Sequence, residues 1–121
     1  MQIWAAEQTL ESADWYQGTA DAVRKQTLEI SSTGAKYVLI LAGDHLYRMD
    51  YKAMADFHYE KNADITVAVQ PVRKSEADRF GILKREADGK ISDFIEKPKG
   101  EEAQAPYVSR NDPERPFLGS M

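Results

Sequence analysis

A carboxylate follows directly behind the most apolar stretch of this 121-residue chain. The segment YVLILAGD (37–44) runs through apolar residues to Gly43 and Asp44, and His45 comes next. A carboxylate at the end of a buried strand, together with the phosphate oxygens of a substrate, is a common way to hold Mg²⁺. On these residues alone, Asp44 as the cap of a following turn is an equally good interpretation, and His45 fits loop packing better than catalysis.

Two further stretches carry residue types that suit phosphate or sugar binding. FIEKPKG (94–100) has the charged pair Glu96 and Lys97 just before a proline, so that Lys97 could bind a phosphate and Glu96 could accept hydrogen bonds from sugar hydroxyls. On an alternating strand the two side chains point opposite ways unless the strand end bends. Taken alone, this motif fits an exposed ion pair better than a binding site.

The stretch WYQGTADAV (15–23) places Gly18 and Thr19 at the expected start of a helix. Free backbone N–H groups at such a position suit an anion or the edge of a base. Aromatic residues before a helix are more often simple packing, so this signal is weakly specific. The seven glycines of the 121-residue sequence never form a G-x-G pattern, so these residues include no phosphate-cradling loop.

Alternating helical and strand patterns must position these residues. The spacing predicts a helix over 18–34 with Thr19 as its N-cap, and a second helix over 50–62 capped by Asp50. An apolar run over 36–43 predicts a central parallel strand. Strands are also predicted over 64–72, where Pro71 ends the strand, and on both sides of ADGK (87–90), whose Asp-Gly pair indicates a β-hairpin.

This order of elements predicts an α/β fold, a partial Rossmann-like domain with a mainly parallel sheet and one β-hairpin. The last part of the chain, residues 98–121, contains four prolines and little apolar periodicity. Such a stretch predicts either a surface excursion or a chain that stops before its anchoring element.

Composition excludes several classes of function. The net charge is −4 and no Lys/Arg cluster occurs, which argues against a nucleic-acid partner. Cysteine is absent, so disulfides and cysteine-ligated zinc are excluded. No apolar run reaches the length of about 18 residues that a membrane span needs. We expect a soluble protein of the cytoplasm, or of the plastid if the source is a plant.

Taken together and in order, five segments strongly resemble glucose-1-phosphate adenylyltransferase, the ADP-glucose pyrophosphorylase family. They are WYQGTADAVR, YVLILAGDHLYRMDY, ADITVAVQPV, FGILKREADGKISDFIEKPKG and the closing LGSM. The resemblance implies transfer of adenylyl from ATP to glucose 1-phosphate with Mg²⁺, giving ADP-glucose and pyrophosphate for glycogen or starch synthesis. It also implies a homo- or heterotetrameric parent protein.

The same resemblance implies roles for single residues. Asp44 corresponds to the magnesium ligand, and Lys97 to the contact with the sugar phosphate. Further contacts with glucose 1-phosphate correspond to Tyr16, Gly81, Glu96 and Ser120. The region beside the ATP base corresponds to Gln8, Gln17, Gly18 and Thr19. Asp44 and Lys97 are the residues expected to take part in catalysis.

The family's Gly-rich loop should precede residue 1, and its β-helix should follow Met121. Residues 1–121 are therefore expected to be the central part of a nucleotidyltransferase catalytic domain, inactive when isolated. Two alternatives stay open: a non-catalytic regulatory subunit of the same enzyme, and a sugar-1-phosphate nucleotidyltransferase that uses another sugar or base.

Overall fold

The computed structural model describes residues 18–42 and 48–120. Contacts divide the chain into two compact units, Met1–Leu41 and Ala42–Met121. Along the described residues, no helix combines the length and the apolar character needed to cross a lipid bilayer.

The described part of the first unit is helical and then extended. The predicted helix over 18–34 is two shorter helices, α1 (Thr19–Lys25) and α2 (Thr27–Ser32), which break at Gln26. Gly18, and not Thr19, is the N-cap residue of α1, because Thr19 already has helical geometry.

The predicted central strand over 36–43 is not found in its described part. Residues 36–42 form neither helix nor strand, and the side chains of 37–41 are half-exposed or more. A strand is defined by hydrogen bonds to a second strand, and an apolar run cannot supply that partner by itself.

Helix α3 (Tyr51–Glu60) in the second unit follows the prediction closely. The side chain of Asp50 accepts a hydrogen bond from the N–H of Ala53 at 3.1 Å, which satisfies one of the free donors at the helix start. In the last turn of the helix, His58 Nδ1 lies 2.7 Å from Thr66 Oγ1, a hydrogen bond that ties α3 to the segment before the sheet.

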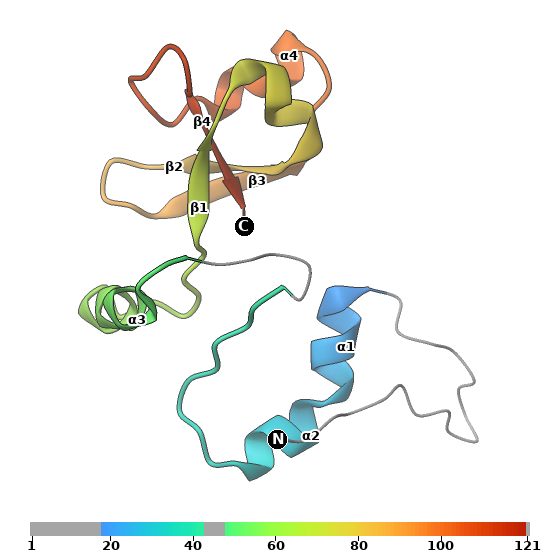
Figure 1. The fold of residues 1–121 in the computed structure, drawn as a ribbon, viewed down its shortest axis with the longest axis vertical. Helices are drawn as coiled ribbons and strands as arrows, with labels where there is room; N and C mark the ends of the chain where they lie inside the picture. The colour runs from blue at the N-terminus through green and yellow to red at the C-terminus, as the bar shows by residue number, and fades with distance from the viewer. Residues whose placement is uncertain (1–17, 43–47, 121) are drawn as a thin grey trace. The chain divides into compact units, whose positions relative to one another are not determined.

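A four-stranded sheet forms the centre of the second unit (Figure 1). Its strands are β1 (Val69–Val72), β2 (Gly81–Arg85), β3 (Ile91–Glu96) and β4 (Phe117–Ser120), and their order across the sheet is β1-β4-β2-β3. Every neighbouring pair is antiparallel. The prediction of a mainly parallel sheet is therefore wrong for the described residues, whereas the β-hairpin of β2 and β3 is confirmed.

A short connection explains why β2 and β3 are antiparallel. A parallel pair needs a long crossover, but only a short turn joins β2 to β3, with Gly89 at a φ of 92°. The strand predicted over 64–72 begins only at Val69, and Pro71 lies inside it. Proline is tolerated there because β1 pairs with β4 alone and forms an edge of the sheet.

The C-terminal stretch is more structured than its prolines predicted. It contains α4 (Glu101–Gln104), a 3₁₀ turn η2 (Ala105–Tyr107) and then β4, which lies between β1 and β2. Strand β4 thus anchors this stretch in the sheet, which neither sequence-based alternative predicted.

One face of the sheet carries the hydrophobic core. Val72, Ile82 and Phe117 from the strands pack with Ala77 of the 3₁₀ helix η1 (Lys74–Arg79), and all four are 2% exposed or less. Phe80, Ile95 and Tyr107 pack against this cluster. The core therefore lies between the sheet and the two 3₁₀ segments, and on the opposite face Leu83 and Leu118, which pair with each other, are also buried.

Candidate active site

Four of the five residues predicted to contact glucose 1-phosphate lie at one end of the sheet, namely Gly81, Glu96, Lys97 and Ser120. Gly81, the first residue of β2, pairs with Glu96, the last residue of β3. Ile82 pairs with Gly119, and the same antiparallel register carried one residue further brings Ser120 beside Gly81. Directly opposed residues share a face, so Ser120, Gly81 and Glu96 form one row on the side away from the core.

Lys97 follows this row at a bend in the backbone. Its φ is 47°, a left-handed conformation that non-glycine residues adopt rarely and at a cost of about 1 kcal/mol or more. The N–H of Lys97 donates to the carbonyl of Phe80 at 3.0 Å, and this hydrogen bond holds the bend.

The bend brings the two charged side chains to the same side. Lys97 Nζ lies 3.8 Å from Glu96 Oε1, although alternation along a straight strand would send the two residues to opposite faces. Both side chains are about 60% exposed, so this loose ion pair contributes little stability. The arrangement presents one cation and one carboxylate to solvent.

A short helix supports the segment after the bend. The amide of Gln104 in α4 is buried and donates from Nε2 to the carbonyl of Pro98 at 3.1 Å. Lys74 and Glu101 form an ion pair of 2.6 Å that links η1 to the start of α4. Two elements therefore restrain the chain that leaves Lys97.

Phe94 belongs to the same face, although the sequence analysis did not single it out. A Cβ placed on Gly81 would lie 2.6 Å from Phe94 Cζ and 2.9 Å from Ser120 Oγ, so the absent side chain of Gly81 is what admits the phenyl ring. The available signal was spacing: Phe94 stands two residues before Glu96, and alternation puts both on one face.

The predicted nucleotide-binding residues are only partly described. Gly18 and Thr19 lie at the start of α1, both exposed, and the carbonyl of Gly18 accepts from the N–H of Ala22 at 3.1 Å. Four other predicted site residues fall outside the described residues: Gln8, Tyr16, Gln17 and Asp44, the predicted metal ligand. Within 18–42 and 48–120, no three His, Asp or Glu side chains cluster as a metal site would need.

Comparison with known proteins decides the family. The family model described as nucleotidyl transferase matches residues 1–111. This chain belongs to the nucleotidyl transferase family.

The resemblance to glucose-1-phosphate adenylyltransferase is also confirmed at the level of sequence. The chain is 42% identical over 129 aligned positions to the chloroplastic/amyloplastic small subunit of glucose-1-phosphate adenylyltransferase from Triticum aestivum. The alignment covers 100% of this chain and 27% of the wheat protein. The nucleotidyl transferase chain thus spans about a quarter of the length of that relative.

In this nucleotidyl transferase chain, the loop over residues 109–116 leads into β4 and so to Ser120. Hydrogen bonds between its two ends close the loop. Ser109 Oγ accepts from the N–H of Arg85 at 3.0 Å, and the N–H groups of Ser109 and Arg110 both donate to the carbonyl of Pro116. These bonds fasten the two ends of the loop to each other and to β2.

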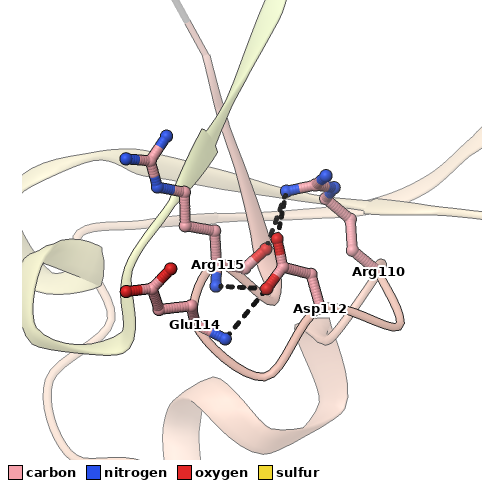
Figure 2. Close-up of polar contacts among 4 residues, drawn as sticks. All are labelled: Arg110, Asp112, Glu114 and Arg115. Atoms are coloured by element: carbon pink, nitrogen blue, oxygen red, sulfur yellow. Dashed lines mark hydrogen bonds and ion pairs between the residues drawn. The ribbon is translucent and has the colours of Figure 1, made fainter.

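Asp112 organises the inside of this loop (Figure 2). Its Oδ1 accepts from the N–H groups of Glu114 and Arg115 at 3.0 and 3.3 Å, and its Oδ2 lies 3.4 Å from a nitrogen of Arg110. The backbone hydrogen bonds, aided by the two arginines, lower the pKa of Asp112 below its usual value.

This lowered pKa predicts a pH dependence of stability. Folding favours the ionised carboxylate, so its contribution is complete above the ordinary aspartate pKa of about 3.9 and is lost as the pH falls through the lower folded value. Asp112→Asn keeps an acceptor oxygen but removes the charge. We expect the variant to be less stable than the wild type at pH 7, by a difference that shrinks toward pH 3. Urea unfolding at several pH values measures it, and a difference independent of pH would contradict the role of the charge.

Proposed function

We propose that this chain is part of an enzyme that transfers adenylyl from ATP to glucose 1-phosphate and releases pyrophosphate. The observation that carries the proposal is the row of Ser120, Gly81 and Glu96 with Lys97 beside it. These are the residues at which the resemblance puts the sugar phosphate, and they come together from three strands. The 42% identity to the wheat adenylyltransferase subunit supports the choice of reaction.

The proposed reaction needs no protein nucleophile. A phosphate oxygen of glucose 1-phosphate forms a bond to the α-phosphorus of ATP, the bond to the bridging oxygen of the β-phosphate breaks, and pyrophosphate leaves with the electron pair. In this proposal Lys97 binds the sugar phosphate and offsets negative charge in the transition state. Glu96 accepts hydrogen bonds from sugar hydroxyls, and Ser120 and Gly81 border the same site.

Mg²⁺ with Asp44 as its ligand is the metal part of the proposal, and it rests on residue type and sequence position. Divalent cations generally assist nucleotidyl transfer by binding phosphate oxygens. The ATP base is proposed to lie near Gln8, Gln17, Gly18 and Thr19, with Tyr16 on the sugar side.

Residues 1–121 are proposed to form the central part of a catalytic domain within a tetrameric protein, located in the cytoplasm or, in a plant, in the plastid. Light scattering on the protein as its gene encodes it measures the assembly.

The test is an assay of pyrophosphate release from ATP with that protein. We expect release that requires both glucose 1-phosphate and Mg²⁺ and that stops when the metal is chelated. UTP, GTP or dTTP in place of ATP, and galactose or mannose 1-phosphate in place of the glucose ester, serve as controls. Faster turnover with one of these would shift the proposal to another nucleotidyltransferase. Binding of glucose 1-phosphate without turnover would favour a non-catalytic subunit.

A further inference from the structure

Phe94 is a large apolar side chain that stays half in water beside the predicted sugar site. Its side chain is 49% exposed, whereas Leu83, its partner across the β2–β3 ladder, is 5% exposed. The core packs on the other face of the sheet, through Ile82 and Ile95. On the face of Phe94 itself, Leu83 and Leu118 are each 5% exposed, whereas the phenyl ring beside them stays half-exposed.

The space that the phenyl ring occupies is open because its neighbour Gly81 has no side chain. A Cβ on Gly81 would lie 2.6 and 2.7 Å from Phe94 Cζ and Cε2, closer than real contacts allow. The phenyl ring therefore occupies the space above the Gly81 backbone. Ser120 Oγ borders the same space, and Glu96 pairs with Gly81 on the far side. The result is an apolar surface with a hydroxyl, a carboxylate and the Lys97 ammonium around it.

Such a combination matches the chemistry of a pyranose. A glucose ring with equatorial hydroxyls has apolar C–H groups on its faces and polar groups at its edge. Small-molecule sites typically join an aromatic or apolar wall to a few placed polar groups. An axial hydroxyl in an epimer interrupts one face of the ring, so an aromatic surface that packs on that face selects against the epimer.

The geometry points to Phe94 as a specificity-determining residue, on whose exposed ring the sugar of the sugar phosphate packs. This inference rests on the proposed function and deepens it. Glu96, Lys97 and Ser120 then bind the edge and the phosphate of the sugar, and Phe94 selects the shape of its face. The ring contributes mainly to binding of the sugar phosphate, and it leaves binding of ATP unchanged.

The test uses the protein as its gene encodes it, with Phe94→Ala, Phe94→Leu and Phe94→Tyr. We expect Phe94→Ala to raise KM for glucose 1-phosphate about tenfold, since loss of an aromatic contact costs about 1 to 1.5 kcal/mol. KM for ATP should stay within about twofold, and Phe94→Tyr, which keeps the flat ring, should stay near the wild type. Phe94→Leu keeps apolar volume but not the ring face, so the preference for glucose over galactose 1-phosphate should fall.

A matched control is Phe57→Ala. Phe57 is the same residue type, is 44% exposed, and lies in α3 with its ring 3.9 Å from the Cβ position of Gly89 in the hairpin turn. That turn is at the opposite end of β2 and β3 from Gly81. We expect Phe57→Ala to leave both KM values unchanged.

Direct titration of glucose 1-phosphate by calorimetry separates the two proposals without relying on turnover. If the wild type does not bind the ester, the proposed function fails. If the wild type binds it and the Leu and Ala variants bind equally well with unchanged sugar preference, the role of Phe94 is overturned. Equal rises in KM for ATP and for glucose 1-phosphate, together with lower stability, would likewise reduce Phe94 to a packing residue.

Discussion

Replacing Lys97 with alanine is expected to raise KM for glucose 1-phosphate about 10- to 100-fold. The proposed contact is a charge-assisted hydrogen bond to a phosphate, worth about 1.5 to 3 kcal/mol, and each 1.4 kcal/mol is a factor of ten. KM for ATP should change little, because the contact is made to the other substrate. Steady-state kinetics with each substrate varied in turn measures both constants. A rise confined to KM for ATP would show that the role given to Lys97 is wrong.

The positive φ of Lys97 provides a second variant that separates charge from backbone conformation. Glycine adopts a φ of 47° without strain, whereas alanine does not. Lys97→Gly should therefore be more stable than Lys97→Ala by about 1 kcal/mol and yet show the same defect in KM. Lys90→Ala, at the turn end of the hairpin, is the matched charge control and should leave KM for glucose 1-phosphate unchanged. If Lys97→Gly restored KM, the backbone and not the charge would be the cause.

The second large effect is expected on stability, at Gly119 in the central strand β4. A Cβ there would lie 2.7 Å from Val72 Cγ2 and 3.3 Å from two atoms of Phe80. Val72 is 2% exposed and cannot move away without disturbing the core. We expect Gly119→Ala to lower the free energy of unfolding by about 1 to 3 kcal/mol, the usual range for overpacking. Urea unfolding followed by circular dichroism measures the loss.

Two comparisons make this prediction specific. Gly81→Ala introduces the same methyl group on the other face of the sheet. There the obstructing atoms are the tip of the half-exposed Phe94 ring and the Ser120 hydroxyl, which can rotate. It should therefore cost less stability than Gly119→Ala. Combining Gly119→Ala with Val72→Ala removes the clashing methyl, so the double variant should lose less than the sum of the single ones. Strictly additive losses would contradict the proposed clash.

Local interactions explain which parts of the chain were predictable. Helix α3 with its Asp50 cap and the β2–β3 hairpin with Gly89 at positive φ both match the sequence analysis. Their decisive contacts lie within a few residues along the chain, so residue type and spacing carry the information. The family was likewise recognisable from ordered motifs, and the same motifs predict that positions 81, 96, 97 and 120 contact the sugar phosphate.

Tertiary structure alone decided how the strands pair and which residues meet. The short segment FLGS (117–120) has no periodicity of its own, yet as β4 it separates β1 from β2 and pairs antiparallel with both. Strand partners and directions depend on hydrogen bonds between distant segments, which a local pattern cannot specify. The apolar run at 36–42 shows the converse, because it has strand character in sequence and forms no strand in its described part. The sequence thus predicted which residues could bind a sugar phosphate, and the pairing of β4 with β2 brought Ser120 beside Gly81, Glu96 and the ring of Phe94.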